Sequence, residues 1–345
     1  MAPRTSRVWR ALLASPFLLL AWLCFTEMDL AKLDVYQKQV LGSGKIQWDG
    51  GSLTVFSRFY RVDALDEMWR HAVVTFAPSS LGFDAISRWQ MLSFLTDLGP
   101  IYTVWLLESC RSANAWTPAY FATFWAFAAQ FVGIGTIAPI FYFTSLVFGP
   151  RATDVARGLN RRLDSKYFPL LLPLVLGLHN FEVFAGYHSP DPVTRQYWIW
   201  AWQMSPLWIG VANVIGTHTI GSRLQTSRIA PPLLPLGVVC LVSAGVWVST
   251  LLFSPYSMPE IFVPDLAKQT DLLLHVRRAF QFDQVCLFGA SFLWLAYLLL
   301  DMYSAGLVGF DAFWPVALLP VVMACAGPGV TFAIGWYWRE RILSS

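Results

Sequence analysis

The stretch Arg88-Trp-Gln-Met-Leu-Ser-Phe-Leu-Thr-Asp-Leu-Gly-Pro-Ile-Tyr-Thr-Val-Trp-Leu-Leu-Glu108 predicts a membrane-spanning helix that carries two acids. A carboxylate in lipid costs about 2.5–3.5 kcal/mol on insertion scales, so such residues usually face a cavity or a partner. Asp97 and Glu108 are separated by close to three helical turns, which puts them on one face, about 16 Å apart along the axis. The stretch therefore predicts a helix whose acidic face is turned towards other helices.

The composition is that of a membrane protein. The chain has 345 residues, of which 56% are hydrophobic and 13% charged, whereas a soluble domain is usually about 25% charged. Aromatic residues make up 16%, more than an interfacial aromatic belt alone requires. The net charge of +3 is small and scattered, so no basic patch for nucleic acid is expected. The five cysteines are widely spaced, which indicates free thiols rather than a disulfide framework.

Hydropathy predicts an all-α fold, a polytopic integral membrane helix bundle of about eight transmembrane helices. A span needs about 20 mostly apolar residues. The segments that qualify are 8–26, 88–109, 118–148, 167–187, 197–217, 232–253, 283–303 and 311–337. We predict a single transmembrane domain, 1–345, in which residues 27–87 form an extramembrane segment that caps one end of the bundle.

The basic residues leave the orientation open. The loops 149–166 and 218–231 are rich in arginine, and the positive-inside rule places both in the cytosol. With eight spans the N-terminus would then lie outside, although three arginines precede or open the first span. Either one segment does not cross the membrane or the rule fails at the first helix.

The two acids of the first stretch are the leading candidates for chemistry. Gly99-Pro100 between them is expected to kink the helix and to free a carbonyl near Asp97. Glu108 also has a plainer interpretation, as a helix-end residue paired with Arg111 three positions on.

Two further acids lie in other apolar segments. Glu182 shares a helical face with His179, which fits either a satisfied polar pair or a proton relay. A metal site there would need a third ligand that the sequence does not place. Asp301 ends a face that also carries Trp294 and Tyr297, a stripe that is commonly ordinary packing.

Several motifs are absent from the sequence. There is no DDxxD-type cluster for Mg²⁺, no GxxxxGK[ST] or GxGxxG loop for a nucleotide, and neither HExxH nor GxSxG. We therefore expect no metal and no cofactor.

Three stretches resemble a known family. They are Leu106-Leu-Glu108-Ser-Cys-Arg111-Ser-Ala-Asn114-Ala-Trp-Thr117-Pro118, Gln130-Phe-Val-Gly133-Ile-Gly135-Thr-Ile-Ala-Pro139-Ile-Phe-Tyr142 and Trp200-Ala-Trp202-Gln203-Met204-Ser-Pro206-Leu-Trp208. They resemble the fungal membrane-bound terpene cyclases of meroterpenoid biosynthesis, of the ascofuranone, ascochlorin and macrophorin type. The likeness covers about residues 88–215.

This resemblance implies a metal-independent cyclase, which protonates an olefin or epoxide of a farnesyl-type chain and closes rings through a carbocation. Burial keeps a carboxylic acid neutral for that step, and facing aromatic rings stabilise the cation. On this hypothesis Glu108 or Asp97 is the proton donor and Glu182 or Asp301 the terminating base. The residues expected to face the substrate are Tyr102, Trp105, Gln130, Trp202, Gln203, Trp294 and Tyr297.

The implied partners are a lipophilic prenylated aromatic substrate and the lipid bilayer, in the endoplasmic reticulum, with no nucleic acid. Two other hypotheses remain open. A proton-coupled transporter or a sterol- or lipid-binding protein would use Asp97 and Glu108 as a coupling pair, although no internal repeat is visible by eye. A double-bond isomerase would use the same buried acids without closing a ring.

Overall fold

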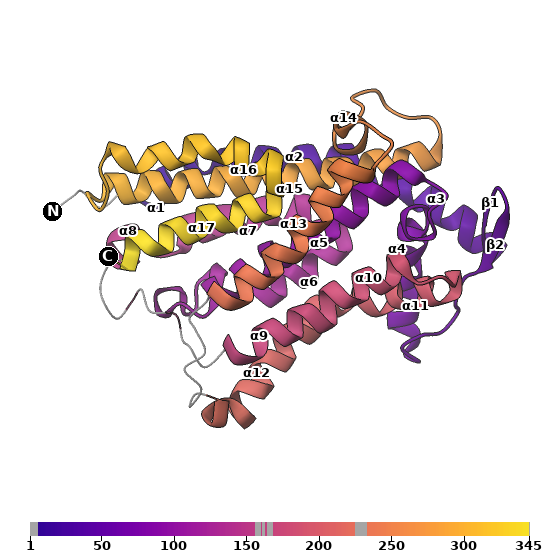
Figure 1. Cartoon of the computed structure of the whole chain (residues 1–345), viewed down its shortest axis with the longest axis horizontal. Coiled ribbons are helices and arrows are strands. Elements are labelled where there is room, and N and C mark those ends of the chain that lie inside the picture. Colours follow the sequence, from indigo (N-terminus) through magenta and orange to yellow (C-terminus); the bar gives the residue numbers. More distant parts are fainter. Residues whose placement is uncertain (1–5, 156–159, 161–162, 164–167, 225–232, 345) are drawn as a thin grey trace.

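The computed structural model describes residues 6–155, 160, 163, 168–224 and 233–344. In this part the chain is a bundle of helices with one small β-hairpin, which bears out the all-α prediction. The N- and C-terminal ends lie at one end of the bundle, and the hairpin lies at the opposite end (Figure 1).

The first half of the chain forms the N-terminal helices, the hairpin and the central helices. The elements are α1 (Arg7–Leu13), α2 (Ser15–Met28), α3 (Leu30–Ser43), β1 (Lys45–Trp48), β2 (Gly51–Thr54), α4 (Asp63–Leu81), α5 (Ala85–Ser109), η1 (Ser112–Asn114), η2 (Pro118–Phe121), α6 (Ala122–Val132), α7 (Ile134–Phe148) and α8 (Ala152–Val155).

The second half adds a peripheral group of helices and the C-terminal pair. The elements are α9 (Phe168–Val175), the π-helical turn η4 (Leu176–Asn180), α10 (Phe181–His188), α11 (Pro192–Gln203), α12 (Ser205–Leu224), α13 (Leu233–Phe253), α14 (Met258–Phe262), α15 (Leu272–Ser304), η5 (Phe310–Leu318), α16 (Leu319–Ala326) and α17 (Pro328–Ser344).

Helix α5 occupies the centre of the bundle. Asp84 caps its first turn by accepting a hydrogen bond from the Ser87 amide, and every residue from Gln90 to Glu108 is buried. Helices α4, α6, α13 and α17 pack around it. At Gly99 the neighbouring α13 comes so close that an added Cβ would lie 2.7 Å from a methyl group of Val239. The predicted acidic helix therefore faces protein on all sides.

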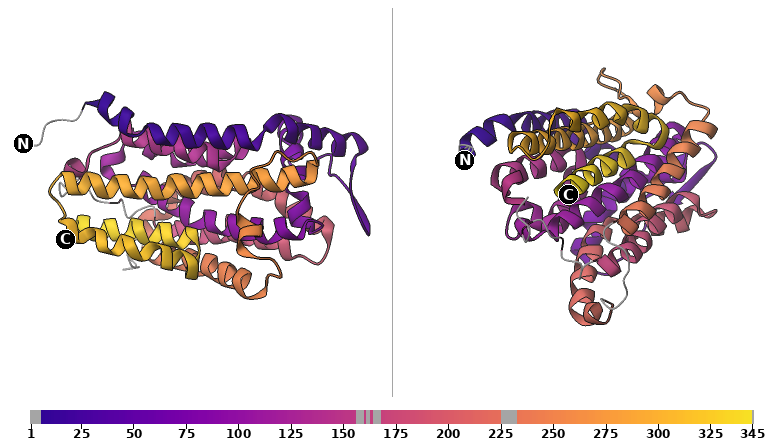
Figure 2. Two further views of the ribbon diagram at one scale, coloured as in Figure 1. Left: turned by 90° about the horizontal axis from the view of Figure 1, so that it is seen from above. Right: turned by 60° about the vertical axis from the view of Figure 1, so that its left-hand side comes forward.

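The prediction of eight spans is wrong for the described residues. Three helices there are long and apolar enough to cross a membrane: Pro169–His188, Leu234–Phe253 and Leu272–Ser304. The pair Arg7–Leu13 and Ser15–Ser43, bent by 46°, makes a fourth if it counts as one span. Figure 2 shows α2 and α3 running beside α15 along the length of the molecule.

The other four predicted spans, 88–109, 118–148, 197–217 and 311–337, are not among these candidate membrane helices, and the reason can be given for each. Helix α5 carries too many polar and charged side chains to have the mean hydropathy of a span. The segments 118–148 and 311–337 are each broken by a glycine, and 197–217 is divided between α11 and α12 at Met204. The resulting pieces Ile134–Phe148 and Phe313–Ala326 are apolar but shorter than a span.

The two glycine breaks use the same device. Gly133 ends α6 with φ 84° and ψ 145°, and Gly327 ends α16 with φ 89° and ψ 164°, a conformation that is open to glycine and strained for other residues. The next residue in each case begins a new helix whose first amides have no partner within that helix. Both new helices begin with a Gly-x-Gly sequence, Gly133-Ile-Gly135 and Gly327-Pro-Gly329.

A buried aspartate from another helix caps each of these new helices. Asp283 of α15 accepts a hydrogen bond from the Gly135 amide at 2.6 Å, and Ile134 bonds to it as well. Asp97 of α5 is bonded in the same way by the backbone of Gly329, and it also accepts a hydrogen bond from Ser243 of α13 at 2.5 Å. A carboxylate at a helix N-terminus is favoured both by the free amides and by the helix dipole.

Residues 27–87 contain α3, the hairpin and α4. The strands pair antiparallel from Lys45 opposite Thr54 to Trp48 opposite Gly51. Gln196 of α11 holds the chain that leaves β2, because its side-chain oxygen accepts a hydrogen bond from the Phe56 amide at 2.7 Å. The extramembrane location of this segment stays a prediction.

The capping device gives a first testable prediction. Gly135→Ala would place a methyl group 2.3 Å from the Asp283 carbonyl oxygen, so we expect it to lower the thermal unfolding temperature, at a cost of about 1–3 kcal/mol or more. Gly289→Ala on the exposed side of α15 is the control, since a Cβ there meets nothing within 4 Å. Fluorescence-detected size exclusion after heating measures both variants in detergent. Equal stability of the two would contradict the assignment.

Candidate functional site

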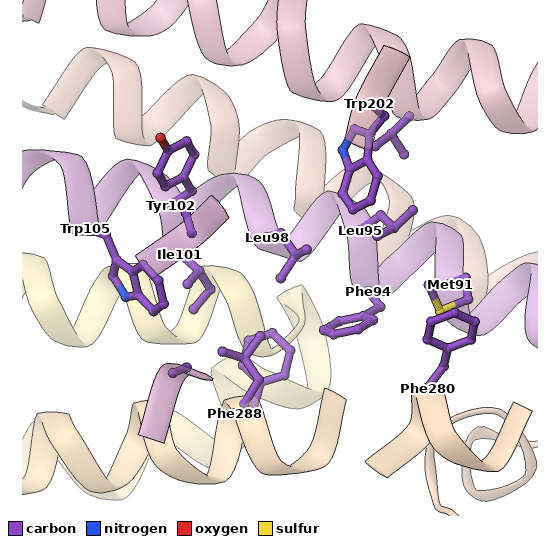
Figure 3. Packing of buried hydrophobic residues seen from close by; sticks show 14 of the residues in the cluster. Met91, Phe94, Leu95, Leu98, Ile101, Tyr102, Trp105, Trp202, Phe280 and Phe288 are labelled. Atoms are coloured by element: carbon purple, nitrogen blue, oxygen red, sulfur yellow. The ribbon is translucent and has the colours of Figure 1, made fainter. Parts of the chain in front are cut away.

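A cavity of about 270 Å³ lies beside α5, between α3, α4, α6 and α15. An engineered cavity of about 150 Å³ already admits benzene, so this one has room for a larger apolar molecule. Figure 3 shows side chains of α5 from Met91 to Trp105, with Trp202 on one side of the helix and Phe280 on the other. The aromatic residues in its wall are Trp69, Phe76, Phe94, Tyr102, Trp105, Phe131, Trp202 and Phe280.

The polar tips of these rings are bonded to protein. The Tyr102 hydroxyl donates to the Pro206 carbonyl at 2.7 Å, and the Trp105 indole N–H donates to the Tyr142 hydroxyl at 3.0 Å. The Trp69 indole N–H lies 3.1 Å from the Met204 sulfur. The rings are therefore fixed in place, and the cavity wall is mostly apolar ring and aliphatic surface.

His179 lies in the π-helical turn and also has both ring nitrogens engaged. Nδ1 accepts a hydrogen bond from the Trp202 indole at 3.1 Å, and Nε2 lies 2.9 Å from the Leu95 carbonyl oxygen. Since a carbonyl only accepts, Nε2 is the protonated nitrogen, and the ring is a connection between α5, the π turn and α11. The relay with Glu182 that the sequence suggests is not formed by these contacts.

Asp283 lines the cavity wall together with Gly133 and Ile134 at the break before α7. Its carboxylate is held by the amides of the new helix, as described above. The break that shortens this span therefore also shapes the cavity wall.

One edge of the cavity is polar. Gln37 of α3 donates to the Thr75 hydroxyl at 2.8 Å, and the Gln37 side-chain oxygen lies 3.2 Å from His71 Nδ1. Thr75 in turn donates to the His71 carbonyl oxygen at 3.0 Å. Gln130 of α6 also lines the cavity and is half-buried.

A second cavity of about 290 Å³ lies at the end of the bundle that holds both termini. Trp294 and Tyr297 line it, and Asp301 accepts a hydrogen bond from the Ala152 amide at 2.8 Å. Arg10 lines it as well and donates to the Gly149 carbonyl oxygen at the end of α7, at 2.9 Å. Charged groups of both signs line this cavity, so it has no clear preference for a ligand of one charge.

Glu108 lies in the wall of the second cavity, at the centre of an ion-pair network. Its carboxylate accepts hydrogen bonds from Arg111 at 3.0 Å, Arg339 at 2.6 Å, Trp336 at 2.7 Å and Asn114 at 2.8 Å. Glu340 supplies the second negative charge, because it accepts hydrogen bonds from Arg111 at 2.6 Å and from Arg339 at 3.1 Å.

These contacts determine the charge of Glu108, which lies outside the helices that are apolar enough to span a membrane. Burial alone raises the pKa of a carboxyl group, but Arg111 and Arg339 outweigh burial and hold the pKa of Glu108 well below its usual range. An ionised carboxylate is a poor proton donor, so this geometry does not fit the role of a catalytic acid. The pairing with Arg111 that the sequence left open is present in the structure.

The predicted site residues thus fall into three groups. Tyr102, Trp105, Gln130 and Trp202 meet in the first cavity, and Glu108, Trp294, Tyr297 and Asp301 meet in the second. Asp97, Glu182 and Gln203 are buried and line neither cavity. Their assignment to one catalytic centre stays a prediction without a common location to support it.

Some residues of these sites were missed by the sequence interpretation. Asp283 lies in an apolar helix, and Gln37 and His71 lie in the polar segment 27–87. None of the three matches a motif, so only their position in the cavity wall and their partners identify them. Arg339 and Glu340 could have been noticed in the sequence, because they are two adjacent opposite charges directly after the mostly apolar residues 328–338.

Comparison with known proteins gives the family of the chain. A family model described as the CtvD domain matches residues 10–344. The FAD-dependent monooxygenase verC1 of Penicillium polonicum is 29% identical over 353 residues, which cover 99% of this chain and 43% of verC1. The FAD-dependent monooxygenase anuJ of Penicillium roqueforti (strain FM164) is 28% identical over 303 residues, 84% of this chain and 36% of anuJ.

A third relative, the FAD-dependent monooxygenase BOA8 of Botryotinia fuckeliana (strain B05.10), is 27% identical over 74% of this chain and 34% of its own length. The chain thus spans less than half the length of each of these curated relatives. No solved structure matches the chain.

These relatives overturn the functional expectation from the sequence. Their names indicate oxidation by a flavin enzyme, so the assignment to terpene cyclases, and with it the metal-independent isomerase activity, is wrong. The transporter and lipid-binding alternative finds no support in them either. The three stretches that carried the resemblance lie in helix ends and helix breaks, and such features do not define a reaction.

The network around Glu108 gives a second prediction. Glu108→Gln would leave two buried arginines short of a counter-charge, so we expect a loss of stability of about 3–5 kcal/mol, as is usual when one partner of a buried pair is removed. Glu67→Gln is the control, because the Glu67 side chain is 63% exposed and its surface pair with Arg70 is worth at most about 1 kcal/mol. Thermal unfolding in detergent compares them. A Glu108→Gln protein as stable as the control would contradict the structural role.

Proposed function

This chain belongs to the CtvD domain family, and on that premise we propose that it is the membrane-embedded, substrate-binding unit of a FAD-dependent oxidation system. The observation that carries the proposal is the aromatic cavity beside α5. Ligand sites are typically concave and apolar with a small number of placed polar groups, and this cavity has that composition.

FAD itself does not fit the described part of the chain. A dinucleotide is usually bound where a glycine-rich turn joins a parallel strand to a helix. The sheet that the described residues form is one antiparallel hairpin of two four-residue strands, and its loop does not lead into a helix. We therefore place the flavin outside these residues and assign to this chain the binding and orientation of the molecule to be oxidised.

The surroundings of the cavity support access from the bilayer. Phe131, which lines the cavity, is 49% exposed on α6, and Phe124 on the same helix is 61% exposed. On α2, Leu19 and Trp22 are also exposed. Apolar surface of this kind on a helical bundle fits contact with lipid. A lipophilic molecule dissolved in the bilayer would reach the cavity without crossing water.

We propose a lipophilic prenylated aromatic compound as the ligand. A flexible prenyl chain suits a cavity with walls of aliphatic and aromatic side chains, and aromatic pairs add about 0.5–1.5 kcal/mol beyond the area they bury. The flavin enzyme would then meet a substrate that is already held in one orientation.

Filling the cavity tests the binding function. Ala129→Phe would place a ring in the cavity, so we expect at least a tenfold loss of affinity for a tritiated farnesylated phenol. Ala128→Phe is the matched control, because Ala128 precedes it on the same helix and does not line the cavity. A scintillation-proximity assay in nanodiscs measures binding, and empty nanodiscs correct for partition into lipid. Equal affinities of the two variants would place the ligand elsewhere.

The division of labour gives a separate prediction. We expect the purified chain to carry no stoichiometric flavin in its visible absorbance spectrum and to leave the bound phenol unoxidised in air. Oxidation is expected once a FAD-dependent monooxygenase and its nicotinamide reductant are added, read by product mass. Stoichiometric flavin on the purified chain would overturn the proposal that this chain only binds the substrate.

A further inference from the structure

We propose that Gln37, His71 and Thr75, here called the edge triad, recognise a hydroxyl group on the head of an amphiphilic ligand. The inference rests on the proposed function, because it concerns a ligand in the same cavity. It adds the chemical class of that ligand and the direction in which it lies, with its polar head at the α3–α4 edge and its apolar tail among the rings.

The edge triad is a preformed unit. The Gln37 amide group donates to the Thr75 hydroxyl at 2.8 Å, and Thr75 donates to the His71 carbonyl oxygen at 3.0 Å. The Gln37 side-chain oxygen faces His71 Nδ1 at 3.2 Å. Two helices are thereby joined by a closed set of hydrogen bonds that fixes the orientation of the imidazole.

This orientation assigns the roles of the two ring nitrogens. Nδ1–H donates to the Gln37 oxygen, and in that tautomer Nε2 is a hydrogen-bond acceptor. The Glu67 carboxylate lies 3.7 Å from Nε2, which is beyond hydrogen-bonding distance. A hydroxyl group of a ligand would donate to Nε2.

Apart from Gln130 on α6, the polar side chains of the wall that lie away from the edge triad already have protein partners. Tyr102, Trp105 and His179 are bonded to protein groups, and Asp283 is bonded to the first amides of α7. Burying a ligand hydroxyl beside them would leave it without an acceptor, at a cost of about 1–3 kcal/mol. Of the acceptors that remain, those of the edge triad are held in a fixed orientation by their own hydrogen bonds, so we place the head of the ligand there.

The side chains of the cavity wall become more buried from the edge triad towards the far side of the cavity. The His71 side chain is 31% exposed and Glu67 is 63% exposed, whereas Trp105 on the far side of the cavity is 1% exposed. A molecule with one polar end and a long apolar end matches this gradient in one orientation only.

The experiment compares a para-farnesyl phenol with its methyl ether, which has the same tail but no hydroxyl proton. In nanodiscs carrying the wild-type protein, we expect the phenol to bind roughly fivefold more tightly, the value of one neutral hydrogen bond. In His71→Phe the preference should disappear while the affinity for the methyl ether stays within about twofold. His188→Phe is the control, since His188 stacks on Phe184 away from the cavity.

The outcomes separate the two proposals. Equal binding of phenol and ether by the wild type, or an unchanged preference in His71→Phe, would overturn the edge triad and leave the binding function standing. Failure of both compounds to bind the wild type would overturn both. If His71→Phe does not give a monodisperse protein, Gln37→Leu makes the same test, because it removes the group that fixes the His71 ring.

Discussion

Helix α17 is held against α5 by the two acids of α5, and the arrangement of the bundle depends on these two attachments. Asp97 binds the first turn of α17 through Gly329, and Glu108 binds its later turns through Trp336 and Arg339. The separation from Asp97 to Glu108 along α5 is close to the separation from Gly329 to Arg339 along α17. The two helices therefore run parallel. A buried charge must be paired or hydrogen-bonded to be tolerated, and each acid therefore specifies one position of α17.

The same requirement explains the cavity. A helix that stops inside an apolar bundle exposes amides that must find an acceptor. Asp283 provides it for α7, as Asp97 does for α17. Because Asp283 and the break at Gly133 lie in the cavity wall, the interruption of the predicted span 118–148 and the shape of the binding site have one cause. If 118–148 formed one continuous helix, Gly133 and Ile134 would not line the cavity as they do, and the cavity would have a different shape.

The sequence allows the helical class, the central stretch 88–108 and four of the cavity residues to be predicted, because hydropathy and clustered aromatic rings are local signals. It does not reveal which acids are structural. Asp97, Glu108 and Asp283 look alike in a list of buried carboxylates. Their partners Ser243, Arg339 and Gly135 lie more than a hundred residues away in the sequence. The stretch from Glu108 to Asn114, which suggested a cyclase, is an ion-pair network. Such a network stabilises a fold whatever reaction the protein serves.

On the proposed function, the membrane also determines which interactions can give selectivity between ligands. A prenylated ligand that moves from lipid into the cavity leaves one apolar environment for another, so burial of its tail gives little driving force, just as helix association in lipid gains little from the hydrophobic effect. Ring packing and a small number of hydrogen bonds must then discriminate between ligands. In this proposal the edge triad is the part of the cavity that distinguishes an oxidisable amphiphile from the lipids around it.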